Sequence, residues 1–205
     1  LDTNYYATYN RPNVTLVNLR QEPIKAITAS GIVTDKRNID VDVIVFATGF
    51  DAMTGAIMAV HPITGRNGKS LSSVWASGPQ TYLGVLVEGF PNLLMAMGPH
   101  AGLGNYTRTA EYSVEWVTGL VSFAMKNGLT RLEATPEGVE SWTDHVKALG
   151  EGLLSNEVDS WMTGINSNVE GKQTRIVARY SGSAPAYRER CDAVAASGYR
   201  ELALS

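Results

Sequence analysis

The sequence predicts an α/β fold, in which a parallel sheet is covered by helices. The strongest indication is an almost unbroken apolar run at residues 41–47, which is typical of a strand buried on both faces. Short segments rich in β-branched residues precede this run and indicate further strands. In the second half of the chain, apolar residues recur every three or four positions, which indicates amphipathic helices.

A β-hairpin is expected early in the sequence. Residues 14–18 and 24–28 are both short and rich in β-branched side chains, as strands are. Ser30 and Gly31 favour a turn after the second of these segments. Residues 32–34 are then expected to return as the second strand of the hairpin.

The apolar run at residues 41–47 is predicted to be a buried strand that stops at Thr48 and Gly49. Residues just beyond the carboxyl end of such a strand are where open α/β sheets bind ligands. The following residues, 51–80, are rich in glycine and serine and are expected to form mostly loops, with a weak strand or turn at 63–68.

The first long helix is predicted over residues 107–127, after two apolar, strand-like segments at 82–87 and 93–97. Gly128 stands where a C-terminal helix cap belongs. Helical spacing assigns five apolar residues to the buried face, namely Val114, Val117, Leu120, Val121 and Ala124.

The second helix has the clearest start, with Thr135 as its N-cap and Pro136 as its first helical residue. Polar residues 155–174 predict a long mobile loop, and residues 175–180 predict a short strand. The apolar residues of this second helix follow at steps of three and four, namely Val139, Trp142, Val146, Leu149 and Leu153.

A last helix is predicted from Pro185 to just before Gly198, with Tyr187, Cys191 and Val194 facing inward. Cys191 is the only cysteine of the chain. A single cysteine excludes an internal disulfide and a cysteine-rich metal site, and it fits a reducing, cytoplasmic location.

The composition indicates a globular protein and argues against several classes of partner. The chain has 205 residues, of which 44% are hydrophobic and 18% are charged. Its formal net charge is −3 and it has no basic block, so neither nucleic acid nor an anionic membrane is an expected partner. No apolar run approaches the roughly 20 residues that a membrane helix needs.

Metal and nucleophilic catalysis are not expected from the motifs. His61, His100 and His145 are far apart and form no ligand pair at helical spacing. The sequence also lacks the Gly-x-Ser-x-Gly motif of a nucleophile elbow. We therefore expect these histidines to be ordinary core or surface residues.

A glycine-rich turn and a loop tryptophan each leave two interpretations open. Gly102 and Gly104 precede a helix, as in a dinucleotide fingerprint, but Thr107 stands where the third glycine would be. The turn is either an ordinary connection or a helix start that presents N–H groups to an electron-rich ligand. Trp161, in a polar loop, either folds back on the core or covers a flat ligand.

Several segments, taken in order, resemble the C-terminal part of a flavin-dependent Baeyer–Villiger monooxygenase of the cyclohexanone monooxygenase kind. The Ala-Thr-Gly motif that ends at Gly49 is shared by many flavoproteins, whereas the ordered set is specific. The segments that carry the resemblance are residues 1–14, 42–51, 78–84, 89–95, 98–99, 160–161, 164–166, 171–172 and 187–192.

The resemblance implies part of a flavoprotein with two dinucleotide-binding domains and Rossmann-like sheets. Residues 1–48 would be the tail of the NADP-binding domain, and residues 49–205 the C-terminal part of the FAD-binding domain, including the mobile loop at 155–174. The implied activity uses FAD, NADPH and O2 to insert oxygen next to a ketone carbonyl, giving an ester or lactone, with cyclic ketones as expected substrates. The catalytic arginine of the family is expected upstream of Leu1, so this chain alone should be inactive.

The resemblance also assigns roles to individual residues. The ketone pocket would be lined by Leu103, Gly104, Asn105 and Tyr106. Because Gly104 has no side chain, this wall would leave room for a bulky substrate. The residues expected to bind the cofactors are Thr48, Gly49, Asp51, Asn105, Tyr106, Trp161 and Lys172, with Trp161 on a loop that closes over NADP.

The expected partners are therefore a small ketone, O2 and the remaining, N-terminal part of the same protein. Two alternatives remain open. One is a non-catalytic binding domain derived from a flavoprotein, and the other is part of an N- or S-oxidising flavin monooxygenase.

Overall fold

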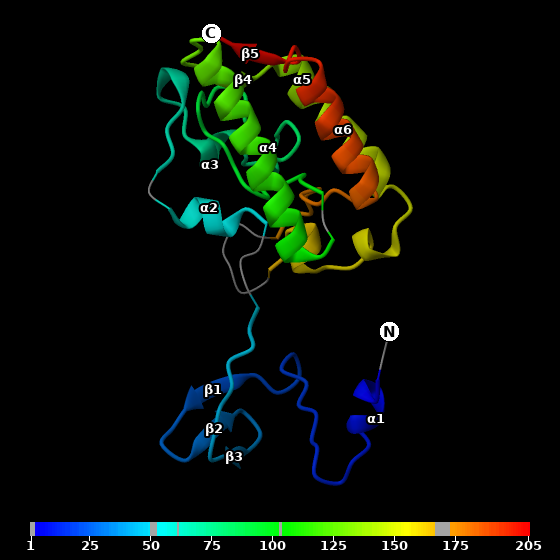
Figure 1. Ribbon diagram of the computed structural model, residues 1–205. Helices are drawn as coiled ribbons and strands as arrows, with labels where there is room; N and C mark the ends of the chain where they lie inside the picture. The colour runs from blue at the N-terminus through cyan, green and yellow to red at the C-terminus, as the bar shows by residue number, and fades with distance from the viewer. Residues whose placement is uncertain (1–2, 50–52, 61, 103, 167–172) are drawn as a thin grey trace. The chain divides into compact units, whose positions relative to one another are not determined.

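The computed structural model describes residues 3–49, 53–60, 62–102, 104–166 and 173–205. Within these residues the chain divides into two compact units, Leu1–Thr48 and Gly49–Ser205 (Figure 1). Each unit has its own sheet, and we describe each by itself.

The first unit contains a three-stranded antiparallel sheet in the order β1-β2-β3. Its elements are α1 (Tyr5–Thr8), β1 (Ile24–Ile27), β2 (Gly31–Thr34) and β3 (Asn38–Asp40). β1 and β2 pair with Ile27 opposite Ile32, which confirms the expected hairpin. A Cβ at Gly31 would collide with the backbone of β3, so glycine is needed at the start of β2.

A buried carboxylate holds the turn after β2. Glu22 accepts a hydrogen bond from Thr34 Oγ1 at 2.8 Å and from Arg37 Nε at 2.7 Å. These bonds hold the pKa of Glu22 below its ordinary value, with the Arg37 hydrogen bond as the largest cause. A charged pair thus stabilises a sheet that has few buried apolar side chains.

Two strands expected in the first unit are absent, so these predictions are wrong. Residues 14–18 and 41–47 lie in the described part of the chain and form no strand there. In the second segment Val43 is 75% exposed and Val45 is 80% exposed. A buried parallel strand needs hydrogen-bonding neighbours on both edges. All strand pairs among the described residues are antiparallel, and none of them includes this segment.

The second unit is mainly helical, with α4 and α6 packed along each other and a small antiparallel sheet of β4 and β5 (Figure 1). Leu132 pairs with Leu204 in this sheet, and Ala134 pairs with Leu202. The elements of the second unit are α2 (Gly55–Ala59), η1 (Arg66–Gly68), α3 (Leu71–Val74), α4 (Tyr106–Lys126), β4 (Leu132–Ala134), α5 (Pro136–Gly150), η2 (Leu154–Asn156), η3 (Trp161–Thr163), α6 (Ala184–Ala196) and β5 (Leu202–Leu204).

The three long helices begin within one residue of their predicted starts, and a side chain caps each of them. The Asn105 side chain accepts from Arg108 N at 3.2 Å at the start of α4. Thr135 accepts from Gly138 N at 3.1 Å at the start of α5, with Pro136 as the first helical residue. Such caps satisfy N–H groups that have no partner inside the helix, which is why they mark helix starts.

The ends of two helices also follow the sequence prediction. Gly128 (φ 66°) follows α4 and Gly198 (φ 74°) follows α6, both in the left-handed region that glycine tolerates. α6 buries Tyr187, Cys191 and Val194 as expected. α5 buries Val139, Trp142 and Val146, and it ends at Gly150, so Leu153 lies beyond the helix.

The buried face of α4 differs from the prediction. Leu120 and Ala124 are buried, but Val114 and Val121 are exposed. The helix instead buries two aromatic residues whose polar tips find partners on α6. Trp116 Nε1 donates to Cys191 O at 2.9 Å, and Tyr112 OH donates to Asp192 Oδ1 at 2.8 Å. Large rings with satisfied polar groups bury more area than valines, and they decide the orientation of the helix.

The remaining expected strands are segments without regular sheet structure, and only residues 82–87 are buried throughout. Residues 82–87 form only an isolated bridge between Tyr82 and Leu86, and residues 93–97 and 175–180 are irregular. A Cβ at Gly84 would collide with Ala101, and its φ of 67° interrupts the extended backbone. Apolar composition thus predicted the burial of residues 82–87 correctly, but it did not predict the backbone conformation of any of the three segments.

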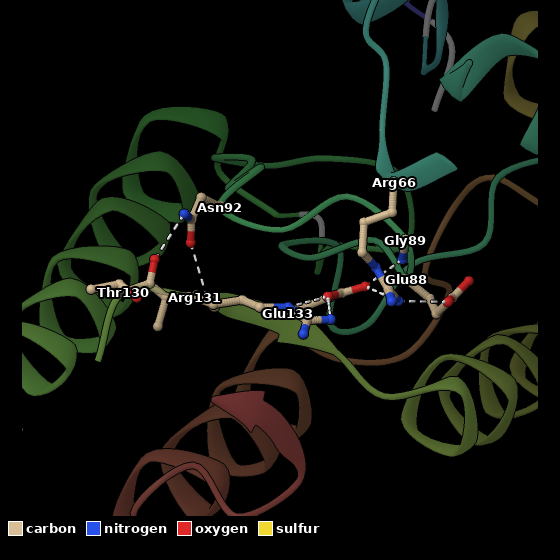
Figure 2. A network of polar contacts seen from close by, with 8 residues as sticks. Arg66, Glu88, Gly89, Asn92, Thr130, Arg131 and Glu133 are labelled. Carbon is tan, nitrogen blue, oxygen red and sulfur yellow. Dashed lines mark hydrogen bonds and ion pairs between the residues drawn. The ribbon is translucent and has the colours of Figure 1, made fainter. Parts of the chain in front are cut away.

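A buried carboxylate, Glu133 on β4, joins the sheet to Arg66 and Gly89, which come earlier in the chain (Figure 2). Glu133 is 1% exposed. Its Oε1 accepts from Arg66 Nη2 at 2.8 Å and from Gly89 N at 2.7 Å, and its Oε2 accepts from Arg131 Nε at 2.9 Å. Burial alone would raise the pKa of this carboxyl, but the hydrogen bonds from Arg131, Gly89 and Arg66 outweigh it and lower the pKa.

The described residues were also compared with the requirements of a membrane-spanning helix and of a metal site. Among the described helices, none is both long enough and apolar enough to cross a membrane. In the described part of the chain, no three His, Cys, Asp or Glu side chains gather in a way that could hold a metal ion.

Candidate functional site

The start of α4 is the first part of the candidate site. Asn105 is the N-cap, and its Oδ1 also accepts from Thr107 Oγ1 at 2.9 Å. Thr109 Oγ1 donates to the backbone oxygen of Asn105 at 3.0 Å. Asn105 therefore has little freedom to rotate. Tyr106, the first helical residue, is exposed to solvent.

Gly104 lies beside this helix start, at a position where a small side chain would fit. A Cβ placed on Gly104 would lie 3.6 Å from both Ala184 Cβ and Thr109 Oγ1, which are ordinary van der Waals distances. A flat group could approach the backbone here, because the first turn of a helix presents N–H groups and a partial positive charge. The residues at this position therefore fit the electron-rich edge of a ring such as that of a flavin.

The segment that leads into α4 is held by a buried histidine. His100 is 1% exposed, its Nε2 lies 2.8 Å from Val177 O, and its backbone N donates to Ala178 O at 3.0 Å. Its Nδ1 is buried and has no hydrogen-bond partner among the described residues. Burial lowers the pKa of His100, so the ring is neutral at pH 7. His100 thus joins the start of α4 to residues 177–178.

Gly102 continues this rigid segment. A Cβ on Gly102 would lie 2.5 Å from the Tyr187 ring, so only glycine fits there without movement. Tyr187 is itself anchored by its hydroxyl, which donates to Leu83 O at 2.7 Å. The turn before α4 is therefore shaped by close packing against α6, which explains Gly102 without a dinucleotide fingerprint.

Trp161 lies on the short helix η3 and is 51% exposed, so it does not fold back into the core. The turn that carries it is nevertheless well defined. Ser160 N donates to Thr163 Oγ1 at 3.1 Å, and Ile176 N donates to Thr163 O at 2.9 Å. An exposed indole on an ordered turn is suited to cover a flat ligand by stacking.

Two arginines that the sequence reasoning did not single out fasten the same loop. Arg175 Nη2 donates to Asp159 Oδ1 at 2.7 Å and to Glu157 O at 2.9 Å. Arg179 Nη2 donates to Ser155 Oγ at 2.9 Å. Both arginines follow the loop in sequence and reach back to its beginning, a contact over 16 to 24 residues that no local signal reveals.

The predicted site residues fall into three groups in the structure. Gly104, Asn105 and Tyr106 are together at the start of α4, whereas Trp161 is on a separate turn of the same unit. Thr48 ends the first unit and Gly49 begins the second, and both are exposed. Three further predicted residues, Asp51, Leu103 and Lys172, lie outside the described residues.

Comparison with known proteins gives a consistent result. No protein-family model matches the chain. A 2-oxo-Delta(3)-4,5,5-trimethylcyclopentenylacetyl-CoA monooxygenase of Pseudomonas putida is 38% identical over the whole chain, which covers 38% of that protein. An acetone monooxygenase (methyl acetate-forming) of Gordonia sp. strain TY-5 is 39% identical, with the same coverage. A phenazine N-monooxygenase of Lysobacter antibioticus is 37% identical over 98% of the chain, which covers 37% of it.

Solved structures agree with these relatives. Cyclohexanone monooxygenase from Rhodococcus sp. Phi1 bound to NADP+ matches the whole chain with a TM-score of 0.88 and 38% identity. OTEMO in complex with FAD and NADP matches with a TM-score of 0.85 and 37% identity. The chain covers 38% and 37% of these two structures, respectively. The resemblance and the α/β flavoprotein fold class inferred from the motifs are thereby confirmed for a chain that spans under two-fifths of its relatives.

Proposed function

We propose that this chain, a homologue of part of the Baeyer–Villiger monooxygenases, contributes that part of an NADPH- and O2-dependent flavin enzyme that converts ketones to esters or lactones. The observation that carries this proposal is the similarity over the whole chain to ketone monooxygenases, in sequence and in structure. Cyclic ketones are the proposed substrates, because a cyclohexanone monooxygenase is among the structural matches. We place the enzyme in the cytoplasm, in keeping with its single, buried cysteine.

We assign residues 1–48 to the NADP-binding domain and residues 49–205 to the FAD-binding domain. The division of the chain into compact units between Thr48 and Gly49 supports this assignment. The chain spans about 38% of the first relatives, so the remaining contacts to both cofactors would come from the rest of the protein. The exposed apolar residues of 41–47 would then gain the neighbouring strands that a buried strand requires.

The start of α4 would bind beside the flavin ring and stabilise its reduced form. FAD supplies the redox chemistry with O2 when it is bound, and NADPH supplies the hydride. The free N–H groups and the partial positive charge at the α4 start would stabilise negative charge on the reduced ring. Asn105 would fix the position of this turn, and Gly104 would leave room for the ketone beside it.

Trp161 would exclude water from the cofactors. Its exposed indole can stack on a flat ring, and the hydrogen bonds of the η3 turn fix the backbone that carries it. A shielded site is needed because water and stray protons divert reduced flavin and O2 to hydrogen peroxide. We therefore assign Trp161 to closure over NADP.

A chimera tests the proposal. The segment of Rhodococcus cyclohexanone monooxygenase that matches this chain is replaced by residues 1–205, and FAD absorbance and NADPH-dependent lactone formation are measured. We expect stoichiometric FAD and lactone. The Trp161→Ala variant should release more hydrogen peroxide per NADPH, whereas Val158→Ala, which changes another exposed residue of the same loop, should not. A chimera that is folded and holds FAD but forms no lactone would refute the proposal.

The 205-residue chain alone provides the complementary test. We expect it to bind no stoichiometric FAD and to oxidise no NADPH, because most cofactor contacts would lie elsewhere. Stoichiometric FAD together with NADPH oxidation by the chain alone would contradict the assignment to part of a larger enzyme. Absence of any cofactor or substrate binding in both the chain and the folded chimera would favour a non-catalytic binding domain.

A second candidate function is N-oxygenation. It is favoured by one observation, the 37% identity to a phenazine N-monooxygenase. Supplying phenazine and cyclohexanone separately to the same chimera distinguishes the two reactions, because the products are an N-oxide and a lactone. We expect the lactone to predominate.

A further inference from the structure

A cavity of about 280 Å³ opens between the starts of α4 and α6. It is distinct from the turn of Trp161 but shares Asn105 with the predicted ketone pocket. Gly102 forms part of its wall, and the rigid packing of Gly102 against Tyr187 gives this wall a defined shape. The lining consists of Gly102, Asn105, Arg108, Thr109, Tyr112, Ala184, Pro185, Tyr187 and Arg188.

The charge of this cavity is positive. Arg108 comes from α4 and Arg188 from α6, and none of the described residues that line the cavity is acidic. Neither arginine forms an ion pair with any residue that the structure describes. By contrast, Arg66, Arg131 and Arg190 of the same unit are each paired with a glutamate. Two arginines that line one cavity, and that have no ion pair among the described residues, favour an anionic ligand.

The Arg188 side chain is held in a geometry suited to binding. Its Cζ lies 4.3 Å from the centroid of the Tyr112 ring, which is a cation–π contact. Stacking occupies the face of the guanidinium and leaves the N–H groups in its plane free to donate. The Tyr112 hydroxyl is fixed in turn by Asp192 Oδ1 at 2.8 Å and by Arg188 O at 3.2 Å. The nearby carboxylate of Asp192 is thus already engaged by a tyrosine.

Apart from Arg188, the α6 side of the cavity is apolar. Ala184, Pro185 and the ring of Tyr187 contribute its α6 side. A ligand that fits both parts has an oxyanion at one end and a compact hydrocarbon body. Since Asn105 also belongs to the predicted ketone pocket, the body of such a ligand would extend toward the reacting end of the site.

We propose that the Arg108–Arg188 cavity binds the oxyanion of a substrate that carries both a ketone and a carboxylate, so that the preferred substrates are small cyclic oxo acids. This inference rests on the proposed function for its catalytic part only. Binding of the acid depends on the cavity alone and can be tested separately.

The binding test uses the 205-residue chain and isothermal titration calorimetry. The probes are 4-oxocyclohexane-1-carboxylate, its neutral methyl ester and inorganic phosphate. We expect the acid to bind at least about tenfold more tightly than the ester, because only the acid offers the arginines a charged hydrogen-bond acceptor. Arg108→Gln and Arg188→Gln should each remove about tenfold of this preference. Arg200→Gln, which changes an exposed arginine outside the cavity, should remove none.

Three results would overturn the inference. Equal affinity for acid and ester would exclude recognition of the carboxylate. An acid preference that survives both Arg108→Gln and Arg188→Gln, in variants with unchanged circular dichroism, would locate the binding elsewhere. Arginine-dependent binding of phosphate without binding of the oxo acid would identify a general anion site rather than a substrate site.

Turnover by the cyclohexanone monooxygenase chimera separates this inference from the proposed function. The ratio of kcat/KM for the acid to kcat/KM for the ester should fall about tenfold in the Arg188→Gln chimera. An unchanged ratio in a chimera that still forms lactone would overturn the oxo-acid inference and leave the proposed function intact. Arginine-dependent binding of the acid in a folded, FAD-loaded chimera that forms no lactone would overturn the proposed function and retain the anion site.

Discussion

Replacing Glu133 with alanine should lower the free energy of unfolding of the second unit by about 3 kcal/mol. The change removes the only described carboxylate that both Arg66 and Arg131 contact, and it leaves the N–H of Gly89 without its acceptor. Glu133 is almost completely buried, so water cannot easily replace the lost bonds. Arg66 and Gly89 would lose their contacts with β4 (Figure 2).

The magnitude follows from the burial of the partners. Breaking a buried ion pair by removing one partner costs about 3–5 kcal/mol. Arg66 and Arg131 are 46% and 40% exposed, so both regain water when the carboxylate is removed, and we expect the lower end of that range. For a chain of this size, about 3 kcal/mol corresponds to a decrease in Tm of about 6–12 °C.

Urea denaturation followed by tryptophan fluorescence measures this change. Glu88→Ala is the matched control, because Glu88 contacts the same Arg66 at 3.4 Å but its side chain is 42% exposed. An exposed pair contributes about 0–1 kcal/mol, so this variant should be nearly as stable as the parent chain. A loss in Glu133→Ala no larger than that in Glu88→Ala would refute the reasoning.

Acid titration adds a second readout for the same residue. The pKa of Glu133 is lowered in the folded state, so its stabilising contribution is fully present above the ordinary pKa of 4.5. This contribution should disappear as the pH falls through the lowered folded pKa. A Glu133→Gln variant should lack this part of the acid dependence.

Three further predictions concern single residues. The pKa of the buried His100 is lowered, so the free energy of unfolding should fall as the pH drops below about 6.5, by at most about 1.4 kcal/mol per pH unit. Urea titrations at several pH values measure this slope, and the His100→Asn variant should lack it. Burial raises the pKa of the Cys191 thiol to about 11. At pH 8 the folded chain should therefore react with a disulfide reagent far more slowly than the urea-unfolded chain. Equal reaction rates would contradict the burial of Cys191. In the cyclohexanone monooxygenase chimera, Gly104→Phe should reduce the turnover of bulky ketones and leave that of small ketones unchanged. An unchanged ratio of the two turnover rates would count against Gly104 as part of the wall of the ketone pocket.

Elements with local signals were predictable from the sequence. The start of α5 depends on Thr135 and Pro136, which are adjacent in the chain and act on the first turn of that helix. The β1–β2 hairpin depends on a turn of three residues, 28–30, between short strands. Such signals operate within a few residues, so they do not require knowledge of the rest of the fold.

Predictions that depended on distant partners were less reliable. The apolar run at 41–47 predicted a buried strand, but its residues are exposed because no described segment pairs with them. The valines expected on the inner face of α4 gave way to Tyr112 and Trp116, whose partners are on α6. The pairing of Arg175 with Asp159 and the salt bridges of Glu133 also link residues that carry no mutual sequence signal.

The candidate site shows the same division. By itself, the sequence determined the family resemblance, a helix start close to residue 107 and the small residue at position 104, because motifs, helix starts and residue size are properties of short segments. Only the tertiary structure decided that Arg108 and Arg188 face one cavity and that Trp161 is exposed. These features depend on how α4, α6 and the loop before residue 175 pack, and packing is set by side chains that are far apart in the chain.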